Sequence, residues 1–268
     1  MKNKNNPTLK EIFAMALQNY KRRDLKNAEN LCYKVISIDS NHFDSTFLLA
    51  TISAMNNNFA QAKQFLHKAI KIEPKNVSAF NNLGTAYKEL GDFKKAINYY
   101  NKTLEIDPEH VNAHYNLGAV YYKLKEVKKA KSYFQKTIQI QPNFALALFS
   151  IANVYVDLKD FNNAVSCYQK AIESNPNLVG AYNNLGLVYR KLNDFENALS
   201  CYEKVIKIKP DHVGAHHNLA MIFKELGQFE KAIKSHEIAM KYEPENATHY
   251  YYLSELKKDI LNSEVKIK

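Results

Sequence analysis

The sequence has few of the residues and segments on which several classes of protein depend. Its three cysteines, in a chain of 268 residues, are too few for a disulfide framework and predict free thiols in a reducing compartment. The stretch MKNKNNPTLK lacks the apolar core of a signal peptide. No run approaches the roughly 20 apolar residues that span a membrane. These absences together predict a cytoplasmic protein that does not bind membranes.

Patterns that would indicate catalysis are missing as well. The seven glycines fall at positions of a repeat and form no phosphate-binding loop. Carboxylates such as Glu89, Asp107 and Glu225 are scattered over helix faces that we expect to be exposed to solvent. An active site needs converging groups in a shielded pocket, and no Ser-His-Asp or Cys-His set is evident. The sequence therefore predicts a protein that is not an enzyme and has no cofactor and no metal.

Two histidine pairs have a spacing that can present two metal ligands on one helix face. They are His110 with His114 and His212 with His216. However, His114 and His216 occupy a position that holds a large residue such as Phe80 in other repeats. The two pairs also lie three repeats apart, which is too far to share an ion. We therefore interpret these histidines as structural.

The net charge of +10 raises the possibility of nucleic-acid binding. Much of the excess lies in residues 1–42 and 123–136, whereas other segments are slightly acidic. There is no continuous basic stripe and no module for base recognition. Solvated helix faces explain the charge, and we expect no nucleic-acid partner.

What the sequence does contain is a period of 34 residues. Residues that lie 34 positions apart form columns of similar residues, and three of these columns hold Leu or Ile, Gly or Ala, and Tyr or Phe. Six prolines are spaced in this way: Pro74, Pro108, Pro142, Pro176, Pro210 and Pro244. An alanine recurs without exception: Ala28, Ala62, Ala96, Ala130, Ala164, Ala198 and Ala232. A regular period of this length indicates a structural unit that stacks on copies of itself.

Each period predicts two amphipathic helices. Residues 77–90 and 93–106 place apolar residues at spacings of three and four. Between them, Gly91 suits a left-handed helix end and Asp92 suits the next N-cap. The Asp107–Pro108 pair ends the second helix, because the residue before proline is pushed out of the helical region. We expect the alanine and glycine columns to face each other inside each hairpin.

The pattern Leu-Gly-x-x-Tyr, then Ala, an aromatic residue and Pro, resembles the tetratricopeptide repeat (TPR) family. The resemblance implies an all-α fold, a right-handed α-solenoid of about seven helix-turn-helix repeats with a capping helix at roughly 248–261. The expected division is a polar segment 1–8, seven repeats over 9–246 (9–42, 43–76, 77–110, 111–144, 145–178, 179–212 and 213–246), and a capping helix and tail over 247–268.

In TPR arrays the first helix of each pair lines a concave groove, and the resemblance implies which columns face it. These columns hold the asparagines Asn82, Asn116, Asn184 and Asn218 beside Asn81 and Asn183. A carboxamide both donates and accepts hydrogen bonds, so such residues can hold the backbone of an extended peptide. The pattern is similar to the asparagine ladder in the TPR arm of protein O-GlcNAc transferase. The alternative is that asparagine at these positions belongs only to the fold.

The same columns carry apolar and basic residues. Apolar side chains on the solvent-exposed wall of a groove usually mark a contact surface. We expect peptide contacts at Tyr115, Tyr122 and Phe149, and also at Arg190 and Lys224. A second apolar set, Phe13, Leu17, Phe47, Leu48 and Met55, predicts self-association or ligand contact through the N-terminal repeats; packing within the array is the alternative.

One familiar use of TPR proteins is disfavoured. The clamp for acidic chaperone tails needs two asparagines and three basic residues. Asn153 and Asn184 match the asparagines, but Phe149, Gly214 and Asn218 replace the cations. Without cations a terminal dicarboxylate has little reason to bind.

The sequence therefore predicts a non-catalytic interaction scaffold that binds an extended peptide or protein segment. An alternative is the substrate-recruiting arm of a larger enzyme of the glycosyltransferase or sulfotransferase type. A self-assembling scaffold is a third possibility.

Overall fold

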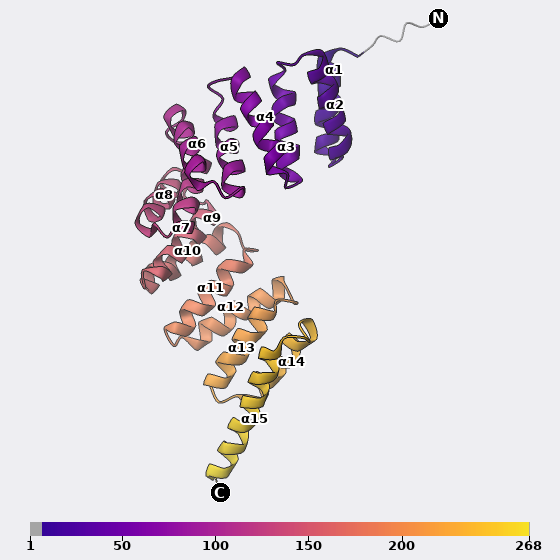
Figure 1. Ribbon diagram of the computed structural model, residues 1–268. Helices are drawn as coiled ribbons and strands as arrows, with labels where there is room; N and C mark the ends of the chain where they lie inside the picture. Colours follow the sequence, from indigo (N-terminus) through magenta and orange to yellow (C-terminus); the bar gives the residue numbers. More distant parts are fainter. Residues whose placement is uncertain (1–6, 268) are drawn as a thin grey trace, which may run out of the picture. The chain divides into compact units, whose positions relative to one another are not determined.

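The computed structural model describes residues 7–267, and over that range it contains fifteen α-helices and no strand (Figure 1). The chain divides into two compact units, Met1–Ile140 and Gln141–Lys268. The first contains α1 (Leu9–Lys21), α2 (Leu25–Ile38), α3 (Phe43–Met55), α4 (Phe59–Ile72), α5 (Val77–Glu89), α6 (Phe93–Ile106), α7 (Val111–Lys123) and α8 (Val127–Ile140). The second contains α9 (Ala145–Asp157), α10 (Phe161–Ser174), α11 (Val179–Lys191), α12 (Phe195–Ile208), α13 (Val213–Glu225), α14 (Phe229–Tyr242) and α15 (Ala247–Ile267).

The helices pack as consecutive hairpins. The tightest contacts join α1 to α2, α3 to α4, α5 to α6 and α7 to α8 in the first unit, and α9 to α10, α11 to α12 and α13 to α14 in the second. Within each unit the second helix of a hairpin also packs on the first helix of the next, as α4 does on α5 and α10 on α11. The predicted all-helical repeat architecture is confirmed.

The α5–α6 hairpin shows how local sequence sets these boundaries. Gly91 adopts φ +81° in the turn, a left-handed conformation in which glycine has no steric cost. The Asp92 side chain caps α6 by accepting from the backbone N–H of Lys95 at 3.1 Å. Helix α6 ends before Asp107, which is extended at φ −130° and precedes proline. These three sequence predictions are confirmed.

Small residues allow the two helices of each hairpin to approach closely. All seven alanines of the invariant column are 0% exposed. The glycine of the first helix, however, faces an aromatic ring and not the alanine that we expected. A Cβ at Gly84 would lie 2.7 Å from ring atoms of Tyr100, and one at Gly118 would lie 2.6 Å from Cε1 of Phe134. In these two hairpins a Cβ would force the ring to shift, whereas the fifth hairpin has Ala152 and the buried Tyr168 at the equivalent positions.

This pairing predicts a coupled mutational effect. The second hairpin has Ala50 and Leu66 where the fourth has Gly118 and Phe134, and in the fourth a Cβ would lie 2.6 Å from the Phe134 ring unless that ring shifts. We expect Gly118→Ala to lower the free energy of unfolding by about 1–3 kcal/mol through overpacking. In a Phe134→Leu background the same change should cost almost nothing. Denaturant titrations of the four chains measure the coupling; an equal cost in both backgrounds would contradict the prediction.

The three cysteines are free, and burial governs their chemistry. Burial raises the pKa of Cys32 and of Cys201 to about 12, and also raises the pKa of the half-buried Cys167. Only the thiolate is nucleophilic, so at about pH 8 Cys32 and Cys201 should resist a thiol reagent such as DTNB in the folded protein and react after denaturation. Because the unfolded chain ionises first, these thiols should lower stability as pH rises from about 9 towards 12. Rapid labelling of either residue in the native protein would contradict this.

The last helix, α15, is longer than the predicted 248–261. It packs on α14 and buries Leu256 against Ala220 and Ala232. Its Lys257 and Lys258 are exposed, as a capping helix requires.

Candidate functional site

Asparagines of the second unit form a hydrogen-bonded chain across three first helices. Asn218 on α13 donates from Nδ2 to Oδ1 of Asn183 on α11 at 3.4 Å. Asn183 in turn donates to the adjacent Asn184 at 3.3 Å. Asn184 donates to Oδ1 of Asn153 on α9 at 2.9 Å, and this oxygen also accepts from the hydroxyl of Tyr168. The predicted groove asparagines of this unit are therefore brought together.

The first unit contains the same motif. Asn116 on α7 donates to Oδ1 of Asn81 on α5 at 3.3 Å, and Asn81 donates to Asn82 at 3.4 Å. Asn81 is buried at 8% exposure, while Asn82 and Asn116 are half-buried. Bonds of this length are weak, and a carboxamide has two donors and an acceptor oxygen with two lone pairs. Each asparagine therefore keeps capacity for a further partner.

The two networks differ at one end. In the repeat that precedes Asn82, the position equivalent to Asn153 holds Thr51, whose hydroxyl donates to the carbonyl of Phe47 in its own helix at 3.0 Å. Asn82 consequently lacks the acceptor that Asn184 has, and within residues 7–267 no acceptor is found for its Nδ2.

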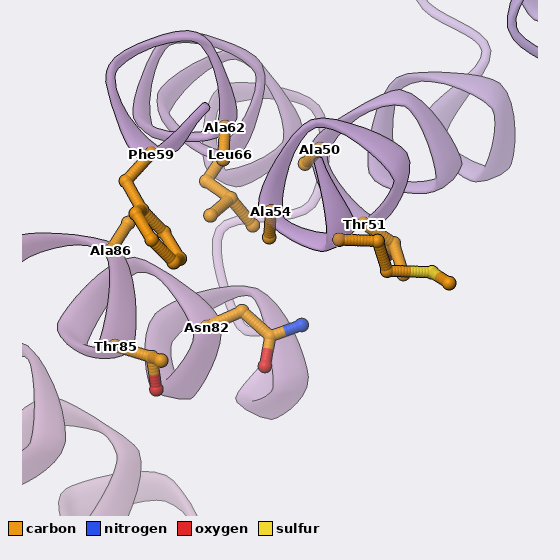
Figure 2. A pocket seen from close by; sticks show the side chains of 10 residues that line it. Ala50, Thr51, Ala54, Phe59, Ala62, Leu66, Asn82, Thr85 and Ala86 are labelled. Carbon is orange, nitrogen blue, oxygen red and sulfur yellow. The ribbon is translucent and has the colours of Figure 1, made fainter. Parts of the chain in front are cut away.

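A cavity of about 300 Å³ opens beside Asn82 in the first unit. It lies among α3, α4 and α5, and the carboxamide of Asn82 extends from α5 towards the side of α3 that carries Thr51 (Figure 2). The lining is Ala50, Thr51, Ala54, Met55, Phe59, Ala62, Leu66, Asn82, Thr85 and Ala86. Apart from Asn82 and two threonines, every lining side chain is apolar.

Three family models, described as TPR repeat or tetratricopeptide repeat, match the chain. The matched residues are 84–125 and 152–193 for the first, 111–144 and 179–212 for the second, and 66–98 and 201–234 for the third. The chain belongs to the tetratricopeptide repeat family.

Solved TPR structures resemble the chain over most of their own length. MamA is 28% identical with a TM-score of 0.58, over 62% of this chain and 97% of that one. YrrB, described as a TPR protein with an unusual peptide-binding site, is 26% identical with a TM-score of 0.54, over 69% and 96%. PilF of Pseudomonas aeruginosa, at 18% identity and a TM-score of 0.71 over 80% and 97%, supports the fold alone. No curated protein matches the chain.

The aromatic residues predicted to bind peptide in the middle of the TPR array fall in different units. Tyr115 and Tyr122 lie on α7 in the first unit, and Phe149 lies on α9 in the second. All three are half-buried. The ring centroid of Tyr115 is 5.9 Å from that of Phe134, and Phe149 is 5.9 Å from Tyr168. The rings of Tyr115 and Phe149 thus pack on their own hairpins, and all three residues leave part of their surface exposed.

The basic residues predicted near the end of the TPR array are constrained. Arg190 on α11 donates from Nε to Oε1 of Glu225 on α13 at 3.0 Å, and its Nη2 binds the same oxygen. This bond to Glu225 raises the pKa of Arg190. The guanidinium is therefore already neutralised. Lys224, half-buried on α13, also makes interactions of its own.

Of the five apolar residues predicted for the N-terminal repeats, Met55 alone lines the cavity. Leu48 is only 6% exposed and belongs to the core. Phe13 and Leu17 pack partly against that core, and Phe47 stacks on Phe43 at 5.6 Å. The large apolar side chains left exposed in the first hairpin are instead Met15, Tyr33 and Ile38.

The histidine pairs serve the fold, as predicted. His110 and His212 accept from the backbone N–H of Ala113 and Ala215 as N-caps. His114 is buried and its Nε2 lies 2.9 Å from the carbonyl oxygen of Pro108, while His216 repeats this geometry. Residues 7–267 contain no group of three or more His, Cys, Asp or Glu placed to hold a metal. None of their helices is long and apolar enough to span a bilayer.

Sequence reasoning missed the cavity and the place of Asn153 in the network. The signal for the cavity is Ala54, which occupies a column that otherwise holds longer side chains: Tyr20, Lys88, Tyr122, Val156, Arg190 and Lys224. The signal for Asn153 was its place three residues, or about one helical turn, after Ser150, the member of the predicted column in the same repeat.

Proposed function

We propose that the protein is a non-catalytic scaffold that binds an extended peptide segment along the first helices of its hairpins. The observation that carries this proposal is the asparagine network, which recurs in both units on the same helix positions. Side-chain amides held side by side can donate hydrogen bonds to a peptide backbone and accept them from it without contacting the peptide's side chains. The peptide-binding site named for YrrB, a shorter TPR protein, supports the same class of function.

The groups on these helices do not suggest chemistry. In the part of the chain that the structure describes, the histidines cap or pack helices, and the buried cysteines have raised pKa values. We therefore propose that the chain has no turnover of its own. The cytoplasmic location, the absence of nucleic-acid and membrane partners, self-association through the N-terminal repeats and the enzyme-arm alternative remain predictions.

Selection from a random library of peptides of about twelve residues, displayed on phage, tests peptide binding, since an extended chain of that length covers roughly 40 Å. We expect the whole chain to enrich peptides that bind saturably as synthetic peptides and compete with one another. Failure to enrich any peptide above an uncoated surface would contradict the proposed function.

A further inference from the structure

The cavity beside Asn82 lies where two repeat positions, one acidic as it also is at Asp157 and Glu225 and the other alanine, leave a phenylalanine ring uncovered. In the third and fifth hairpins a lysine covers the equivalent phenylalanine ring. Lys123 lies 5.1 Å from the centroid of Phe93, and Lys191 lies 5.5 Å from that of Phe161. These contacts are favourable because a cation is attracted to the face of an aromatic ring.

Phe59 has no such cover. The residue at the position of Lys123 and Lys191 is Glu89, and a carboxylate is not attracted to the negative face of a ring. Glu89 instead pairs with Lys88 at 3.0 Å. Ala54 is also too short to fill the space, whereas Arg190 at its equivalent position reaches Glu225. The half-buried Phe59 therefore keeps part of its surface accessible and lines the cavity.

The polar groups at the cavity wall define what it can accept. The hydroxyls of Thr51 and Thr85 donate to carbonyls in their own helices, at 3.0 Å and 3.2 Å, so both threonines already have partners. Asn82 Nδ2 is the donor for which no acceptor is found in residues 7–267. The cavity thus presents an apolar interior beside one backbone-binding amide, a combination typical of a peptide side-chain pocket.

Charge indicates the character of the segment around that side chain. Residues 1–140 contain 22 lysines and arginines against 12 aspartates and glutamates, whereas residues 141–268 contain 15 of each. The net charge of +10 therefore lies in the unit that holds the cavity, mainly in residues 1–42 and 111–140, the segments that precede and follow the cavity's two repeats. Lys21 occupies the position equivalent to Met55 in the preceding repeat, whereas Lys88, equivalent to Ala54 in the following repeat, is paired with Glu89. A field of this sign favours acidic partners.

We propose that this cavity receives one large apolar side chain of an acidic, extended protein segment, whose backbone carbonyl accepts from Asn82. This inference rests on the proposed peptide-binding function and names the sequence that the first unit prefers: an aliphatic or aromatic anchor flanked by aspartate or glutamate. The anchor gains free energy from burial against Phe59, Leu66 and Met55.

The test uses the whole chain and the random peptide library described above. Selected peptides should share one large apolar position with acidic neighbours, and its replacement by alanine should weaken binding tenfold or more. Ala54→Arg should weaken the parent peptide to a similar degree, because it places a long side chain in the cavity. In that variant the peptide's own alanine replacement should have almost no further effect, as a double-mutant cycle measures.

Ala60→Arg is the matched control, because Ala60 lies on the same hairpin, is exposed and does not line the cavity. It adds the same charge and should leave affinity within about twofold of wild type. Arginine is native at the position equivalent to Ala54, so circular dichroism of Ala54→Arg should match wild type. Raised salt should weaken the acidic peptides, since screening reduces attraction between exposed charges.

The outcomes separate the two proposals. Peptides that bind without an apolar preference, with affinity unchanged by Ala54→Arg, would overturn the pocket and leave peptide binding intact. Apolar anchors without acidic neighbours, bound independently of salt, would overturn the charge assignment. Absence of any binding peptide would overturn both proposals.

Discussion

Replacing Asn82, Asn116, Asn184 and Asn218 together by alanine is expected to weaken binding of a selected peptide tenfold or more, with the helical circular dichroism retained. Each amide–backbone hydrogen bond contributes only about 0.5–1.5 kcal/mol. No single asparagine should therefore be decisive. Four losses together exceed the roughly 1.4 kcal/mol that corresponds to a factor of ten.

The fold should tolerate this change, because all four side chains are only half-buried and the bonds of Asn116 and Asn218 are long. Asn184 makes the one bond of ordinary length among them, to Asn153 at 2.9 Å, and Tyr168 still donates to that oxygen in the variant. The matched control replaces exposed asparagines of second helices, Asn30, Asn98 and Asn162, which should leave affinity unchanged. Calorimetric titration with the same synthetic peptide compares the variants. Full affinity in the quadruple variant would mean that these asparagines are residues of the fold and nothing more.

Ala130→Leu is expected to lower the free energy of unfolding by about 2–3 kcal/mol. Ala130 is 0% exposed on α8, at the column where the two helices of each hairpin approach closely. Three added carbon atoms have no space there, so side chains must leave their rotamers or the helices must separate. In a repeat array this loss also weakens the interfaces with neighbouring hairpins.

Lys128→Leu is the control, because Lys128 is exposed on the same helix and gains the same side chain. Its effect should stay within about 0.5 kcal/mol. Denaturant titration followed by circular dichroism measures both variants. Equal stability of the two would contradict the assignment of the alanine column to the hairpin interface.

Much of the fold could be predicted from the sequence, because each position of the repeat occurs several times and all the residues at that position must suit the same environment. Seven alanines at one spacing require one buried position, and all seven are buried. Gly91, Asp92 and Asp107 act on the backbone within a few residues, so their turn and capping roles follow from local geometry alone.

The candidate site could be predicted only in part from the sequence. The asparagine columns followed from the period, but their mutual hydrogen bonds depend on how neighbouring first helices pack within a unit. Arg190 was predicted to face a ligand, yet its partner Glu225 lies 35 residues away. Such pairs join adjacent repeats, and no spacing within one helix reveals them.

The sequence by itself determined the helical repeat, its turns and its buried small residues, because each of these depends on interactions inside one 34-residue unit. Only the tertiary structure decided that Gly84 faces a ring, that Leu48 is buried, and that Ala54 leaves a cavity beside Asn82. A cavity is the space left after side chains from several helices have packed. Ala54, Phe59 and Asn82 come from three different helices, and their combination could not be read from any one of them.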